Sequence, residues 1–186
     1  MITKVRITGF GGQGVITAGY ILGKAASIYD NKHSTFTQSY GPEARGSACS
    51  AQVIISDEKI LYPFIKRQDI LVGLSQEGFD KHIKSTVEGG TVLIDEDLVE
   101  TTNSFPQKID LAKIPTTRLA EKNFDNRIVT NIIMLGFLSS YTGVVTREAI
   151  TEAVKSVVPQ RMIKLNTDAL DFGFEFKVSE TEKSEA

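Results

Sequence analysis

The sequence has 186 residues, of which 41% are hydrophobic and 24% charged, as expected for one globular domain rather than a disordered or fibrous chain. Lysine and arginine total 21 against 23 acidic residues, a net charge of −2, so no basic surface for nucleic acid or an anionic membrane is indicated. The single cysteine, Cys49, excludes an internal disulfide, and no cysteine or histidine pair has the spacing of a zinc or iron–sulfur site.

The sequence predicts a protein without a secretory signal or a membrane-spanning segment. The opening residues MITKVRITGF lack the apolar core of a secretory signal, and no apolar run approaches the ~20 residues that span a bilayer. A cytoplasmic protein is therefore expected, without a membrane or nucleic-acid partner. Residues 1–175 are predicted to form the domain, and residues 176–186, which are polar and charged, a flexible tail.

The chain opens with a short apolar strand that ends at a glycine cluster, GFGGQGV, at residues 9–15. A helix is predicted next, because apolar residues recur at three- and four-residue spacing from Val15 to Tyr29. Residues 34–39 are predicted to form a second strand. Residues 40–47 are then expected to form a loop, since they contain two glycines and a proline without periodicity.

The middle of the chain predicts strands of two kinds. Residues 49–56 and 59–63 are expected to form a hairpin, an antiparallel addition to the sheet. Residues 68–75 and 91–96 are continuous aliphatic runs, typical of parallel strands buried on both faces. Residues 77–90 between them are predicted to be helical and to end at two glycines, which completes a βαβ unit.

The last third of the chain is predicted to be helical. Helices are expected over residues 114–123, 126–141, 146–158 and 166–176. Thr146 has the chemistry of an N-cap, and Pro159 lies just past the end of the same helix. Together the elements predict a Rossmann-like doubly wound α/β domain with a mostly parallel sheet and one antiparallel excursion, which binds ligands at the carboxyl ends of its strands.

The glycine cluster has the features of a phosphate-binding turn. Gly9, Gly11 and Gly14 satisfy the spacing G-x-G-x-x-G between the first strand and the first helix. Glycine permits close backbone approach, and free N–H groups at a helix start favour an anion. No acidic residue stands at the end of the second predicted strand to hold a ribose hydroxyl, and no Gly-Lys-Ser/Thr closes a P-loop. A dinucleotide site is therefore disfavoured, and a plain tight turn remains an alternative.

The loop after the second predicted strand, SYGPEARGS, displays a second group of polar residues. Arg45 offers a planar fork to a carboxylate or phosphate, or pairs locally with Glu43. His33 and His82 have no serine or cysteine neighbour that suggests a nucleophile, and Cys49 begins an apolar strand as a small buried residue. No catalytic residue and no metal ligand is therefore assigned to this chain.

Three stretches together, GFGGQGVITAGYILGKAA, QSYGPEARGSACSAQVIIS and ILYP, resemble the gamma subunit of the 2-oxoacid:ferredoxin oxidoreductases. The later segments NRIVTNIIMLG and LNTDALDFG also resemble that subunit, so the resemblance spans residues 4–175. One departure is Ser47, where the family has a second glycine after the arginine. A positive φ at position 47 is correspondingly less well supported.

The resemblance implies a multisubunit enzyme that oxidatively decarboxylates a 2-oxoacid with coenzyme A, yielding acyl-CoA, CO2 and reduced ferredoxin. In such enzymes the alpha and beta chains hold thiamine diphosphate and magnesium, and a beta or delta chain holds the iron–sulfur clusters. The gamma chain is then a non-catalytic subunit that binds no cofactor by itself. Among the family's substrates, 2-oxoglutarate is favoured, with pyruvate, branched-chain and indolepyruvate forms behind it.

Two sets of site residues follow from combining the loops with the resemblance. The first set is expected to contact the phosphates of coenzyme A or to buttress a partner chain: Gly11, Gly12, Gln13 and Gly14. The second set is expected at the subunit interface: Tyr40, Glu43 and Arg45. The alternatives are a free-standing dinucleotide-binding domain of a dehydrogenase, and a scaffolding module without a ligand.

Overall fold

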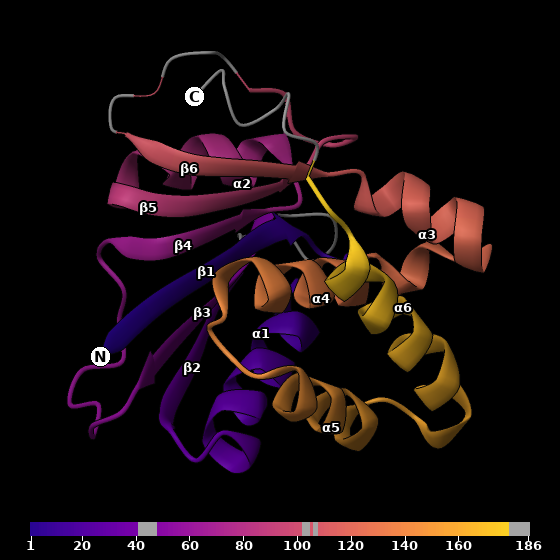
Figure 1. Cartoon of the computed structure of the whole chain (residues 1–186). Coiled ribbons are helices and arrows are strands. Elements are labelled where there is room, and N and C mark those ends of the chain that lie inside the picture. Colours follow the sequence, from indigo (N-terminus) through magenta and orange to yellow (C-terminus); the bar gives the residue numbers. More distant parts are fainter. Residues whose placement is uncertain (41–47, 102–104, 106–107, 179–186) are drawn as a thin grey trace.

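The amino-terminal residues form a central strand of a six-stranded sheet, and their side chains alternate between its two faces (Figure 1). The computed structural model describes residues 1–40, 48–101, 105 and 108–178. Strand β1, Ile2–Phe10, pairs in parallel with β4, Gln68–Gly73, and antiparallel with β3, Ala48–Ser56. Its apolar residues face the larger helical layer, and Arg6 and Thr8 face the opposite side, as strand alternation requires.

The sheet order is β2-β3-β1-β4-β5-β6. Strands β5, Thr86–Asp95, and β6, Ile109–Ile114, continue the parallel sheet beyond β4. On the other side, β2, His33–Tyr40, pairs antiparallel with β3 and therefore runs in the same direction as β1. The predicted mostly parallel α/β sheet with one antiparallel excursion is confirmed, and β3 is that excursion.

Helices cover the two faces of the sheet unequally (Figure 1). The α-helices are α1 Val15–Lys24, α2 Gln76–His82, α3 Thr116–Phe124, α4 Thr130–Thr142, α5 Arg147–Val157 and α6 Ile163–Glu175. A π-helical turn, Ala25–Tyr29, extends α1, and 3-10 turns lie at Ile83–Ser85, Arg127–Val129 and Gln160–Met162. All α-helices except α2 contribute to one large core, and α2 packs over the other face. None of the helices in the described ranges is long and apolar enough to cross a membrane.

Two glycines allow α4 and α6 to cross in backbone contact. A Cβ placed on Gly136 would overlap the carbonyl oxygen of Leu170, and a Cβ on Gly173 would overlap the carbonyl oxygen of Ile133. Neither glycine has a positive φ. The glycines are therefore required by the closeness of the two helices rather than by backbone conformation.

The predicted N-cap of the helix expected over residues 146–158, which is α5, is confirmed. The Thr146 hydroxyl oxygen accepts a hydrogen bond from the backbone N–H of Ala149 at 3.2 Å. Asp30, at the end of the π-helical turn, accepts from both the N–H and the hydroxyl of Thr146. The cap therefore also joins α5 to the end of α1.

Three details of the predicted fold are wrong. Residues 59–63 form no strand, and the antiparallel partners of β3 are β1 and β2. Helix α2 ends at His82, and the two glycines expected to stop it lie inside β5, where Gly89 has φ +73° and Gly90 pairs with Ile109. Strand β6 was not predicted, because Asp110 and Lys113 interrupt its apolar pattern at the edge of the sheet.

Candidate functional site

The glycine loop, residues 11–14, connects the carboxyl end of β1 directly to α1, as the sequence predicts. The N–H of Gln13 donates to the carbonyl of Phe10 at 3.2 Å and closes a tight turn. Gly12 has φ +102° and Gly14 has φ +72°, conformations that side-chain-bearing residues rarely adopt. The backbone can follow this path because both positions are glycine.

The side chain of Gln13 stabilises the glycine loop by hydrogen bonds within the chain. Its Oε1 accepts from the N–H of Phe10 at 2.6 Å, and its Nε2 donates to the carbonyl of Leu74 at 2.8 Å. Leu74 directly follows β4, the parallel neighbour of β1. Both ends of the amide are thus used within the chain, and the side chain fixes the shape of the loop.

Asn131 of α4 holds the other side of the loop. Its Nδ2 donates to the carbonyl of Gly14 at 3.1 Å, and a Cβ on Gly14 would overlap its amide. Among the described residues, no side chain caps the amino terminus of α1. The first N–H groups of a helix have no partner within the helix, so these donors carry a partial positive charge.

A pocket of about 330 Å³ is lined in part by the glycine loop. Its polar lining comes from Gly12 and Gly14 of the glycine loop, Asn131 of α4, Arg161 of the 3-10 turn before α6, and Asn166 of α6. Arg161 is exposed and, within the described part of the chain, pairs with no carboxylate. A helix start and a free guanidinium around one pocket match the chemistry of a phosphate or another anion.

Tyr40 lies at the same end of the sheet as the glycine loop. Gly9 pairs with Cys49, and Cys49 pairs with Tyr40, the last residue of β2. The Tyr40 side chain is 61% exposed and so is available to a partner. Glu43 and Arg45, the other two residues expected at a subunit interface, lie outside the described residues. Cys49 is buried, as predicted.

The strand order argues against a dinucleotide site. In a dinucleotide-binding Rossmann domain the second strand lies parallel and next to the first, and its end carries the acid that holds the ribose. Here the neighbour of β1 on that side is the antiparallel β3, which begins at this end of the sheet with Ala48. The end of β2 carries Tyr40 and lies one strand further away.

Asp95, a buried carboxylate at the end of β5, has a structural role. Its Oδ2 accepts from the hydroxyls of Thr116 and Thr117 and from the N–H of Thr117 at 2.9 Å. These donors begin α3, where a carboxylate is favoured by the unpaired N–H groups and the helix dipole. In the described ranges, no group of three or more histidine, cysteine, aspartate or glutamate residues is placed to hold a metal.

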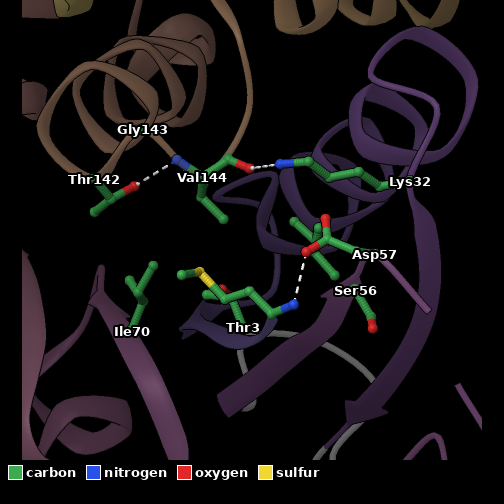
Figure 2. Close-up of a pocket in the computed structure, with 10 residues that line it drawn as sticks. Thr3, Lys32, Ser56, Asp57, Ile70, Thr142, Gly143 and Val144 are labelled. Atoms are coloured by element: carbon green, nitrogen blue, oxygen red, sulfur yellow. Dashed lines mark hydrogen bonds and ion pairs between the residues drawn. The ribbon is translucent and has the colours of Figure 1, made fainter.

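A smaller pocket of about 150 Å³ lies at the opposite end of the sheet, where Ile2 pairs with Ser56 (Figure 2). The amino-terminal ammonium group contacts Asp57 at 2.6 Å, and Lys32 donates to the carbonyl of Val144 at 3.4 Å. The ammonium group lowers the pKa of the Asp57 carboxyl. The charged groups of this pocket are thus engaged within the chain, and the glycine-loop pocket is the better candidate for a ligand.

His82 is expected to make folding stability depend on pH. Its burial, and then the charges of Arg6 and Lys81, lower the pKa of His82 to about 4. The unfolded chain, with an ordinary histidine pKa near ~6.5, binds the proton first as pH falls. The contribution of His82 to the free energy of unfolding is therefore fully present above pH ~6.5 and is lost as the pH falls toward 4. Urea unfolding at several pH values should show that the free energy of unfolding of His82→Gln depends less on pH than that of the wild type. His33→Gln, at an exposed histidine, is the control. The same pH dependence in both variants would contradict the assignment.

Comparisons with known proteins agree with the fold and show the family of the chain. The family model described as pyruvate ferredoxin/flavodoxin oxidoreductase matches residues 4–176. The 2-oxoglutarate synthase subunit KorC of Methanocaldococcus jannaschii is 47% identical over 175 residues, which cover 94% of each chain. The crystal structure of a keto/oxoacid ferredoxin oxidoreductase gamma subunit from Geobacter sulfurreducens is 42% identical, with a TM-score of 0.82, covering 93% of this chain and 96% of that one.

A larger enzyme contains the same fold as a part. The 2-oxoglutarate:ferredoxin oxidoreductase of Magnetococcus marinus matches 96% of this chain with a TM-score of 0.84, over 33% of its own chain. At 19% identity that likeness is one of fold alone. The family match covers nearly all of this chain, and the alignments at 47% and 42% identity each cover more than nine-tenths of both aligned chains. The chain therefore belongs to the pyruvate ferredoxin/flavodoxin oxidoreductase family, as a gamma-type subunit of a 2-oxoacid:ferredoxin oxidoreductase complex.

Proposed function

We propose that this chain is the gamma subunit of a 2-oxoglutarate:ferredoxin oxidoreductase and that its glycine-loop pocket binds the phosphates of coenzyme A. The complex converts 2-oxoglutarate and coenzyme A to succinyl-CoA and CO2 and reduces ferredoxin. The KorC relative, named as a 2-oxoglutarate synthase subunit, supports the substrate.

The observation that carries the proposal is the pocket of about 330 Å³ between the glycine loop and Arg161. Its volume lies at the lower end of those typical of small-molecule sites, enough for the phosphate-bearing part of coenzyme A. A Cβ on Gly12 would meet no atom of the described residues within 4 Å, which leaves the backbone there accessible to a ligand. Gly11, Gly12 and Gly14 are proposed to present N–H groups, Gln13 to hold their geometry, and Arg161 to neutralise a phosphate.

The remaining parts of the reaction are proposed to lie on partner chains. Thiamine diphosphate and magnesium are assigned to the alpha and beta chains, and the iron–sulfur clusters to a beta or delta chain. Tyr40, Glu43 and Arg45 are proposed as interface residues, which is consistent with the exposure of Tyr40 beside the glycine loop. The same end of the sheet would then meet both coenzyme A and a partner chain.

An assay of the purified complex tests the proposed function. The chain is co-expressed with its partner subunits, and ferredoxin reduction is measured with 2-oxoglutarate, pyruvate, 2-oxoisovalerate and indolepyruvate, each with coenzyme A. The expected result is the highest kcat/KM with 2-oxoglutarate and no reduction without coenzyme A. A higher kcat/KM with another 2-oxoacid would overturn the substrate. Tight binding of NAD to the chain in calorimetry would favour the dehydrogenase alternative.

A further inference from the structure

The 59–67 loop, which lies between β3 and β4, exposes large apolar side chains. Leu61 is 87% exposed, Tyr62 60% and Phe64 57%. The rings of Tyr62 and Phe64 meet edge to face with centroids 5.4 Å apart. Single exposed apolar residues are common on protein surfaces, but a contiguous group marks a surface that another molecule covers. The glycine-loop pocket does not include these residues, so the proposed function leaves them unexplained.

The loop is tied to the sheet by a buried arginine. The carbonyl of Ile65 accepts from Nη2 of Arg6 at 3.0 Å, and the N–H of Ile65 donates to Oε1 of Gln52 at 3.2 Å. Arg6 also donates to Gln68 at 3.3 Å, and in the described part of the chain no carboxylate pairs with it. Burial lowers the pKa of the Arg6 guanidinium. The fold thus places a costly buried charge where it holds the loop in one conformation.

Positive charge predominates on the loop that carries the apolar group. Lys59, Lys66 and Arg67 are exposed on the same loop, and the described residues offer them no ion-pair partner. Of the two acids just before the loop, Asp57 pairs with the amino-terminal ammonium group at 2.6 Å, and Glu58 is exposed. The three cations therefore outnumber the one acid that has no ion pair among the described residues. A complementary surface therefore has an apolar centre and a rim of carboxylates.

The loop also lies away from the glycine-loop pocket. It leaves β3 at Ser56, which pairs with Ile2 at the amino end of β1, whereas the glycine loop follows Phe10 at the other end. Figure 1 shows the connection between β3 and β4 extending from the sheet near the amino terminus. A partner that covers the 59–67 loop therefore leaves the coenzyme A pocket open.

We infer that the 59–67 loop docks into an apolar pocket bordered by carboxylates on a partner subunit of the same oxidoreductase. The inference rests on the proposed function, because it takes the partner from that complex. Leu61, Tyr62 and Phe64 supply the buried centre, and the three cations supply the rim. Because Arg6 already fixes the loop, little conformational entropy is lost when the partner binds.

The test is assembly of the co-expressed complex carrying Leu61→Ala and Tyr62→Ala together. Truncation of buried interface anchors is expected to weaken subunit association about thirtyfold, measured by native mass spectrometry and mass photometry on dilution. Tyr20→Ala with Ile28→Ala is the matched control, since both side chains are exposed on α1 and the π-helical turn. Tyr62→Phe keeps the ring and should assemble as wild type. Wild-type association of the Leu61/Tyr62 double variant would overturn the inference.

The rim is tested separately by charge reversal. Lys66→Glu with Arg67→Glu should slow association and reduce its dependence on salt. Lys84→Glu with Lys122→Glu, at exposed lysines elsewhere, is the control. Equal effects of the two pairs would contradict an acidic partner surface. Failure of the proposed function is distinguishable, because a wild-type complex that assembles but does not use 2-oxoglutarate refutes the substrate and leaves the docking result standing.

Discussion

Gly173→Ala is expected to destabilise the chain by about 3 kcal/mol, because α4 and α6 have no room for a methyl group where they cross. The new Cβ would overlap the carbonyl oxygen of Ile133, a backbone atom of α4. Rotation of a side chain cannot relieve this contact, so the two helices must separate and lose core packing. For a domain of this size the midpoint of thermal unfolding should fall by roughly 6–12 °C.

Gly23→Ala is the matched control for this prediction. Gly23 is also helical and buried, but the nearest atom to an added Cβ is the hydroxyl of Ser34 at 3.6 Å, an ordinary contact. Alanine favours the helix over glycine by up to about 1 kcal/mol, so this variant should be neutral or more stable. Urea unfolding of both variants is the measurement. Equal stability of Gly173→Ala and Gly23→Ala would show that the crossing is looser than described.

Gly14→Val is expected to cost about 3 kcal/mol and to disturb the glycine loop. Gly14 has φ +72°, where a β-branched residue is strained, and its Cβ would overlap the amide of Asn131. The amino terminus of α1 must shift, and with it the N–H groups that face the pocket. Loss of stability should therefore accompany a raised KM for coenzyme A in the complex.

A double-mutant cycle separates strain from overlap at this position. Gly14→Ala alone meets both the unfavourable φ and the Asn131 side chain, whereas in Gly14→Ala with Asn131→Ala only the φ remains. The two substitutions should therefore be less destabilising together than the sum of the singles, by about 1 kcal/mol. Strict additivity would mean that Asn131 moves aside freely and does not fix the loop.

Sequence patterns predicted the elements that are specified by the residues within one short segment. The strand, glycine loop and helix at the amino terminus and the βαβ unit of β4, α2 and β5 were predicted because apolar runs and periodicity specify them residue by residue. The 59–63 segment reads as a strand by the same rule. The two partners that β3 needs are instead taken by β1 and β2, which is a long-range pairing that no short pattern reveals.

The candidate site likewise contains residues that local spacing predicts and residues that only the tertiary structure brings together. The glycine loop was predicted from its spacing, and Gln13 was named with it, although its role as an internal brace depends on Leu74, which lies 61 positions further along the chain. Asn131, Arg161 and Asn166 were not predicted to join the pocket, because α4, α6 and the turn before α6 come together with the glycine loop only in the tertiary structure. The one available signal was the resemblance of the segments around Asn131 and Asn166 to the gamma subunits.

The central claim, that the glycine-loop pocket binds the phosphates of coenzyme A, is tested most directly by the steady-state kinetics of Arg161→Ala in the purified complex. A hydrogen bond to a charged group is worth about 1.5–3 kcal/mol, so KM for coenzyme A should rise roughly tenfold to a hundredfold. KM for 2-oxoglutarate should stay at its wild-type value. Lys164→Ala, one turn further along and paired with Asp168, should change neither constant. An unchanged KM for coenzyme A in both Arg161→Ala and Gly12→Val would contradict the claim.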